Sequence, residues 1–327
     1  AGDEYIDDAC DYFRIVMVGM SFTALSAVIN AAQRGIGNTR IAMVTNIAAN
    51  VVNIILNYLL IGGNFGFPRL EVRGAAIATL AGNAVCFIIA LASVLRKQGF
   101  LRLTGRSLVR FDADTVRLIA SISSSAAVEQ LFIRIGFFVY AMLVAKLGTI
   151  PLATHQICMN IINLSFCVGD GLGMAASSLV GQNLGKKRPD LAEVYGKASQ
   201  RVGIMISAFL VMLFLFGGRM LMDLFTDDNT IIEYGIKLLI IVAVCSPAQV
   251  SQVIFSGCLR GAGDTKYVAL VSFISIGVFR PMLTYVFCYT LGLGLIGAWL
   301  SLLVDQYTRL FFSATRFSRG KWKEIRI

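Results

Sequence analysis

The chain has 327 residues, of which 57% are hydrophobic and only 15% are charged. A soluble domain contains about 45–50% apolar and about 25% charged residues, so this composition excludes an ordinary soluble protein. The net charge of +10 is compatible with a nucleic-acid partner, and its placement along the chain therefore decides its meaning.

Apolar residues recur in long blocks that match the thickness of a membrane. A hydrocarbon core of about 30 Å requires about 20 helical residues. The sequence predicts nine spanning helices, near 12–33, 41–62, 74–95, 116–146, 151–183, 202–224, 231–257, 267–290 and 293–315. The predicted fold class is thus all-α, a polytopic membrane protein.

Basic residues concentrate in alternate connections between these spans. With the acidic N-terminal segment outside, most of the 29 Lys and Arg residues fall on the cytoplasmic side. Such a bias sets the orientation of membrane helices, and it explains the net charge without a nucleic-acid partner. We expect a multi-pass protein of the plasma (cell) membrane, with the N-terminus of this chain outside and its C-terminus cytoplasmic.

Two short segments resemble each other and indicate an internal repeat. Residues 31–40 read AAQRGIGNTR and residues 257–266 read GCLRGAGDTK, each between two spans. A Gly-Ala pair then opens the third span of each copy, at Gly74-Ala75 and at Gly297-Ala298. The copies are six spans apart, so they share one orientation and predict two lobes related by an axis along the membrane normal.

The repeat also predicts how the chain is divided. Residues 1–95 would be the last three helices of an N-terminal lobe, 96–114 a cytosolic linker, 115–316 a six-helix C-terminal lobe and 317–327 a basic cytosolic tail. Spans four to six have no upstream copy. We therefore expect three further helices before Ala1, making twelve in two six-helix lobes.

Polar side chains form a stripe on the second span. Asn46, Asn50, Asn53 and Asn57 are four, three and four residues apart, so they share one helical face. Polar groups at membrane depth face the protein interior or an aqueous cavity. We predict that this stripe lines a cavity or binds an ion, completed by polar side chains of the third span, Thr79 and Asn83. Interhelical hydrogen bonding is the simpler explanation.

Glu129 lies deep in the fourth span, where a carboxyl group can exchange protons or meet a cation. It could instead be a structural partner for Arg134 or Arg280. Further polar, aromatic and methionine side chains predict a hydrated central cavity that contacts an apolar cation, with ordinary helix packing as the competing explanation. These candidates are Phe132, Phe137, Tyr140, Gln156, Met159, Asn160, Asn163, Gln249, Gln252 and Ser256. The role of Asp170 stays open, and Asp305 with Arg309 is predicted to be a structural pair.

Other classes of site lack their sequence signals. His155 is the one histidine, and the seven cysteines form no CxxC pair, so neither a metal site nor a catalytic residue is predicted. The Gly-rich turns do not match the phosphate-binding loop Gly-x4-Gly-Lys-Ser/Thr, and a nucleotide partner is not expected. Arg34 and Arg260 in those turns are expected to bind helix-end carbonyls or lipid phosphates. We expect no enzyme, and an ion gradient as the energy source.

Four motifs resemble the multidrug and toxic compound extrusion (MATE) antiporters, and we expect the chain to belong to their DinF-like branch. They are Gln33-Arg34-Gly35 through Thr39, Leu259-Arg260-Gly261 through Thr265, Ala153-Thr154-His155-Gln156, and SSLVGQNLGKKRPDLA at 177–192. The resemblance implies a V-shaped pair of six-helix bundles, with this chain starting just before the fourth helix. It also implies that Arg34, Gly35, Gly181, Gln182, Arg260 and Gly261 belong to structural motifs.

The resemblance further implies roles for single residues. Asn53, Asn57 and Thr79 match the first-lobe cation or proton site, where the DinF-like branch often has Asp at the position of Asn57. Glu129 matches the seventh-helix acid of the NorM-like branch, whose tenth-helix acid falls at Gln249 here. The chain departs from both patterns, so the resemblance leaves Na⁺ and H⁺ open as the coupling ion.

The expected function is a secondary active antiporter that exports amphipathic, cationic organic compounds in exchange for Na⁺ or H⁺, without a cofactor. The expected partners are a small organic molecule and the lipid bilayer. One rival is a flippase for lipid-linked oligosaccharides, which needs a cavity rich in Arg and Lys. A second rival is a membrane-embedded enzyme, and a third is a fragment that is inactive without its first three helices.

Overall fold

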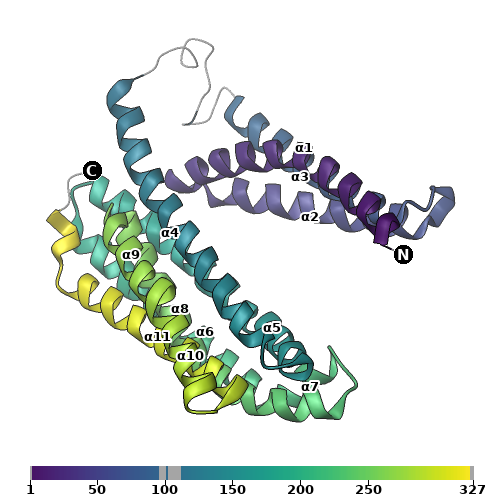
Figure 1. The fold of residues 1–327 in the computed structure, drawn as a ribbon. Helices are drawn as coiled ribbons and strands as arrows, with labels where there is room; N and C mark the ends of the chain where they lie inside the picture. Colours follow the sequence, from purple (N-terminus) through teal and green to yellow (C-terminus); the bar gives the residue numbers. More distant parts are fainter. Residues whose placement is uncertain (1, 96–100, 102–111, 325–327) are drawn as a thin grey trace. The chain divides into compact units, whose positions relative to one another are not determined.

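The computed structural model describes residues 2–95, 101 and 112–324. These residues are helical apart from short connections, and they contain no strand. The chain divides into two compact units, Ala1–Phe111 and Asp112–Ile327. The all-α prediction is therefore confirmed (Figure 1).

The first unit consists of three long helices and one short turn of 3₁₀-helix. Helix α3 packs against both α1 and α2 (Figure 1). Glycines on α3 permit this closeness, because a Cβ at Gly74 would lie 2.8 Å from the carbonyl oxygen of Leu60 and one at Gly82 would lie 2.9 Å from that of Ala49. The elements are α1 (Gly2–Gly35), α2 (Thr39–Gly62), η1 (Asn64–Gly66) and α3 (Glu71–Leu95).

The second unit is built around α8. In the most apolar stretch of this helix 67% of the residues are buried, and α8 packs against α5, α6 and α11. The elements are α4 (Ala113–Ala145), α5 (Thr149–Gly185), α6 (Pro189–Phe216), α7 (Gly218–Asp223), α8 (Asn229–Gly261), α9 (Thr265–Ser272), η2 (Phe273–Phe279), α10 (Arg280–Tyr285), η3 (Val286–Thr290), α11 (Gly294–Ser318) and η4 (Lys321–Glu324).

Helices α5 and α8 meet backbone to backbone at glycines. A Cβ on Gly257 would collide with the backbone of Gly173, and one on Gly261 would collide with the backbone of Ser177. A Cβ on Gly181 would lie 3.1 Å from the carbonyl oxygen of Gly261. Small residues at such a contact allow the close helix approach that membrane proteins use. The SSLVGQ and LRG motifs thus pack against each other, in agreement with a structural role for Gly181 and Gly261.

The repeated turns have the same backbone geometry. The helices end at Gly35 and Gly261, and the next helices begin four residues later. Gly37 (φ 88°) and Gly263 (φ 80°) occupy the same repeat position, a left-handed conformation that glycine adopts without strain. Each donates its N–H to the carbonyl of the arginine three residues earlier, at 3.0 Å. The local repeat inferred from the sequence is confirmed.

The span count and one boundary differ from the prediction. Eight helices of the described residues are long and apolar enough to cross a membrane. The ninth predicted span is α11, which is a helix but carries Asp305, Arg309 and Arg316. The predicted span 202–224 is wrong at both ends: α6 runs from Pro189 to Phe216, because proline suits the first helical turn.

The predicted span 267–290 is interrupted by two π-helical segments, η2 and η3. Pro281 stands at the start of α10 and has no N–H to donate, so the α-helical hydrogen-bond ladder cannot continue through it. Such π-bulges are frequent at functional sites. Here the first one ends immediately before Arg280.

The predicted linker and tail are only partly visible. Residues 96–100 and 102–111 of the linker 96–114, and residues 325–327 of the tail, lie outside the described residues. The described part of the tail packs onto the second unit: Phe317 and Trp322 are buried and stack with their rings 5.0 Å apart. Lys323 also forms an ion pair of 2.5 Å with Glu193.

The contact between α5 and α8 yields a first prediction. Gly257→Ala should lower the free energy of unfolding by about 1–3 kcal/mol, because the new methyl group must push the helices apart. Thermal unfolding of the purified protein measures the loss. Gly171→Ala is the matched control, since a Cβ there meets nothing within 4 Å. Equal melting temperatures for the two variants would contradict this account of the contact.

Candidate functional site

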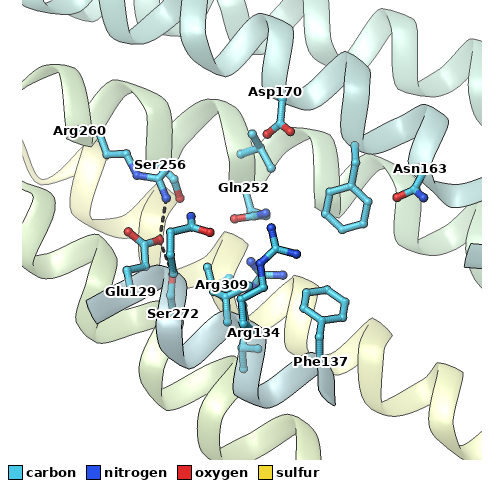
Figure 2. A pocket seen from close by; sticks show the side chains of 15 residues that line it. Glu129, Arg134, Phe137, Asn163, Asp170, Gln252, Ser256, Arg260, Ser272 and Arg309 are labelled. Atoms are coloured by element: carbon cyan, nitrogen blue, oxygen red, sulfur yellow. Dashed lines mark hydrogen bonds and ion pairs between the residues drawn. The ribbon is translucent and has the colours of Figure 1, made fainter. Parts of the chain in front are cut away.

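A cavity of about 360 Å³ lies in the second unit, between α4, α5, α8, α9, η2 and α11 (Figure 2). Its wall combines charged, amide and aromatic side chains, an unusual set at membrane depth. The lining residues are Glu129, Gln130, Ile133, Arg134, Phe137, Asn163, Phe166, Asp170, Gln252, Val253, Ser256, Arg260, Ser272, Ile276 and Arg309.

Glu129 is held at the cavity wall by two partners. Its side chain is 5% exposed, and its Oε1 receives a hydrogen bond from Arg260 Nη2 at 2.6 Å and another from Ser272 Oγ at 3.0 Å. The charged partner is therefore neither Arg134 nor Arg280. Arg260 of the repeat motif forms an ion pair across the unit, where the sequence predicted a helix-end or lipid contact.

Arg134 and Asp170 enter the same cavity from α4 and α5 (Figure 2). Both residues are exposed in this unit. Among the described residues neither of them forms an ion pair. They are thus charged groups available to a bound molecule.

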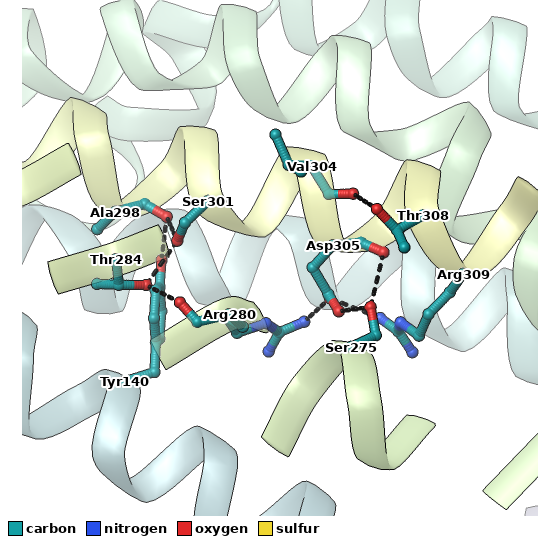
Figure 3. A network of polar contacts seen from close by, with 10 residues as sticks. All are labelled: Tyr140, Ser275, Arg280, Thr284, Ala298, Ser301, Val304, Asp305, Thr308 and Arg309. Carbon is teal, nitrogen blue, oxygen red and sulfur yellow. Dashed lines mark hydrogen bonds and ion pairs between the residues drawn. The ribbon is translucent and has the colours of Figure 1, made fainter. Parts of the chain in front are cut away.

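Asp305 lies at the centre of a buried network behind the cavity wall (Figure 3). It receives hydrogen bonds from Arg280, from Arg309 Nη2 at 3.1 Å and from Ser275 Oγ at 2.6 Å. Arg309 also lines the cavity, so this residue connects the network with the cavity. The predicted Asp305–Arg309 pair is confirmed, while the link to Arg280 was not predicted.

Arg280 is fully buried and also contacts aromatic rings. Its guanidinium carbon lies 4.8 Å from the ring centroid of Phe137 and 5.8 Å from that of Tyr140. The Tyr140 hydroxyl donates to the carbonyl of Ala298 at 3.1 Å. The neighbouring hydroxyls of Thr284 and Ser301 hydrogen-bond each other at 2.6 Å (Figure 3).

Several buried polar atoms near this network have no hydrogen-bond partner among the described residues. They are Arg280 Nε and Nη1, Arg309 Nε, and both amide atoms of Gln249 and of Gln306. Buried polar groups are nearly always paired in folded proteins. The network therefore offers more hydrogen-bond donors than the protein itself satisfies.

The structure brings together only part of the predicted substrate cavity. Phe137, Asn163, Gln252 and Ser256 line it, with Glu129. Phe132 instead packs against Phe273 with ring centroids 4.4 Å apart, beside a separate groove. Tyr140 and Gln249 are buried, Met159 packs against the core, and Gln156 and Asn160 are exposed on α5 away from this cavity.

The first-unit candidates form a short chain of hydrogen bonds. Asn57 Nδ2 donates to Asn53 Oδ1 at 3.0 Å, Asn53 Nδ2 reaches Thr79 Oγ1 at 3.4 Å, and Thr79 donates to its own helix at Ala75. Asn46 bonds the carbonyl of Ala42, and Asn50 is exposed. Asn83 is half-buried. An ion site at these residues stays a prediction.

Some contributing residues were missed at the sequence level. Ser272 and Ser275 are ordinary small residues in an apolar segment, and nothing in their spacing points to Glu129 or Asp305. Arg280 and Asp305 did carry a signal, because a charge at membrane depth usually has a charged partner in the protein.

Comparison with known proteins places the chain. The sequence model of the MatE family matches residues 1–59 and 125–286. The chain belongs to the MATE family. This MATE chain is 29% identical to the probable multidrug resistance protein NorM of Thermotoga maritima, over 98% of this chain and 69% of that protein. It is 27% identical to the multidrug resistance protein MdtK of Edwardsiella ictaluri, over 95% of this chain and 69% of that protein.

Solved MATE structures share the fold. A crystal structure of MATE in the bent conformation has a TM-score of 0.86 and 21% identity, over 98% of this chain and 71% of the other. The structure of an outward-facing conformation of a multidrug resistance MATE family transporter of the MOP superfamily also has a TM-score of 0.86 and 21% identity. This match covers 95% of this chain and 70% of the other. The resemblance stated from four motifs is confirmed, and the protein is a multi-pass membrane transporter.

The buried network of this MATE protein yields a second prediction. Asp305→Asn should destabilise the fold by about 3–5 kcal/mol, because it leaves two buried arginines without a counter-charge. Arg280→Met should cost less, since Asp305 keeps Arg309 and Ser275. Thermal unfolding of both variants gives the order. A larger loss for Arg280→Met would show that the aspartate does not organise the network.

Proposed function

We propose that this MATE protein is a secondary active antiporter that exports amphipathic organic compounds in exchange for H⁺ or Na⁺. The observation that carries the proposal is a nearly buried carboxyl group, Glu129, at the wall of an open polar cavity. A gradient-driven exporter needs an ionisable group that contacts both the coupling ion and the substrate path. The multidrug resistance proteins among the relatives support the same class.

Competition at Glu129 supplies a coupling step. The carboxylate holds Arg260 at 2.6 Å, and a proton or Na⁺ that binds the same oxygen would release that arginine. The Arg260 side chain is 43% exposed, so its charge can move into water at low cost. Because the ion and Arg260 bind the same group, ion binding favours the conformation in which Arg260 is free.

The first unit supplies a second ion-binding candidate at Asn53, Asn57 and Thr79. Asn57 Oδ1 has no hydrogen-bond partner among the described residues, so it can accept one from a ligand or coordinate a cation. The site has amide and hydroxyl oxygens but no carboxylate. We propose that it binds Na⁺ weakly and that Glu129 is the principal coupling group.

Apolar and aromatic walls support an amphipathic substrate. Phe137 and Phe166 line the cavity beside the charged residues, and Arg280 already occupies a face of Phe137. The resemblance implies organic cations, for which Asp170 is the available carboxylate.

The oligosaccharide flippase is the weaker hypothesis, since two of the three cavity arginines are held by Glu129 and Asp305. We propose the plasma membrane as the location, with the N-terminus of this chain outside and its C-terminus cytoplasmic.

Transport by the complete protein tests this function. Proteoliposomes loaded with ethidium should release it when a Na⁺ or a pH gradient is imposed, and the effective gradient identifies the coupling ion. The absence of gradient-dependent release across a varied panel of organic compounds would reject the antiporter.

Substitution of the coupling group gives a third prediction. Glu129→Gln should reduce gradient-driven release to the level of dye-loaded liposomes without protein, while the protein stays folded. The reason is that the amide binds neither a proton nor Arg260 as the carboxylate does. Glu233→Gln is the control, since Glu233 is exposed on α8 outside the cavity. Unchanged release from the Glu129 variant would assign this carboxylate a purely structural role.

A further inference from the structure

The charges around the cavity do not balance. Four arginines lie at the cavity or in the network behind it, Arg134, Arg260, Arg280 and Arg309, against three acids, Glu129, Asp170 and Asp305. Glu129 compensates Arg260, whereas Asp305 serves both Arg280 and Arg309. The described unit therefore carries an excess of one positive charge at this place.

Such an excess has a physical consequence. A charge at membrane depth is costly unless an opposite charge accompanies it. The cavity therefore attracts an anionic group more strongly than a cationic group. The Arg309 side chain contributes to this positive potential from the cavity wall, where the residue is 8% exposed.

We infer that this cavity binds the carboxylate of an amphipathic substrate between Arg134 and Arg309. Figure 2 shows both side chains entering the cavity from different helices, α4 and α11, together with Gln252 of α8. A guanidinium offers planar N–H donors that match the two oxygens of a carboxylate. Gln252 is 4% exposed, and its side-chain amide adds a further donor.

The remaining wall fits the rest of such a molecule. A cavity of about 360 Å³ lies within the range of ligand sites, and Phe137 and Phe166 give it an apolar surface. Asp170, which forms no ion pair in the described residues, is placed to meet an amine on the same substrate. The inference rests on the proposed function and adds organic acids and zwitterions to the organic compounds that the antiporter would export.

A matched pair of probes tests this site on the complete, purified protein. 2-Naphthoate and 2-naphthamide have the same ring system, and only the first carries a carboxylate. Isothermal titration calorimetry should show tighter binding of 2-naphthoate. Arg134→Gln should raise the Kd of 2-naphthoate about tenfold, the loss of one charge-assisted contact, and leave that of 2-naphthamide unchanged.

Two further variants separate charge from folding. Arg134→Lys keeps the charge and should retain most of the affinity, whereas Arg201→Gln removes an exposed arginine of α6 outside the cavity and should change nothing. Equal Kd values for the two probes, no binding of 2-naphthoate at millimolar concentration, or an unchanged Kd in Arg134→Gln would each overturn the inference. Failure of gradient-driven release would reject the antiporter instead and would leave these Kd values as they are.

Discussion

The requirement that polar groups at membrane depth find partners inside the protein governs this structure. Asp305 shows it most clearly: the side chain is fully buried and is held by two arginines and a serine from three different elements. Helix α11 can carry two charges at mid-length only because both are turned away from lipid into the second unit. The same requirement places Glu129 against Arg260 and Ser272.

Close helix contacts make these polar arrangements rigid. Gly173 and Gly257 bring the backbones of α5 and α8 together, and Gly181 and Gly261 repeat the contact near the helix ends. Arg260 directly precedes the second of these contacts, so the residue that pairs with Glu129 projects from a fixed backbone. The cavity therefore has closely packed walls on the α5 and α8 sides, which hold the orientation of its side chains.

The sequence was informative wherever the signal is local. Long apolar blocks located the spans, and the repeated Gly-rich turns located equivalent helix ends at Gly35 and Gly261. It could not reveal that Glu129 pairs with Arg260, 131 residues away, because helical periodicity gives a direction around the axis but not the neighbouring helix. The same limit separated Phe137, which lines the cavity, from Phe132, which does not. The prediction of one continuous span at 267–290 also missed the two π-helical segments, η2 and η3.

The sharing of one aspartate by two arginines also bears on how this sequence can change during evolution. Loss of Asp305 alone would strand two cations, and loss of both arginines would strand one anion. A change of Asp305 is therefore tolerated only together with changes of both arginines, whereas a single arginine can be lost while the other still pairs with Asp305. Among homologues, positions 280, 305 and 309 should covary as a group, and lineages that have replaced all three by apolar residues would mark transporters with a differently charged interior.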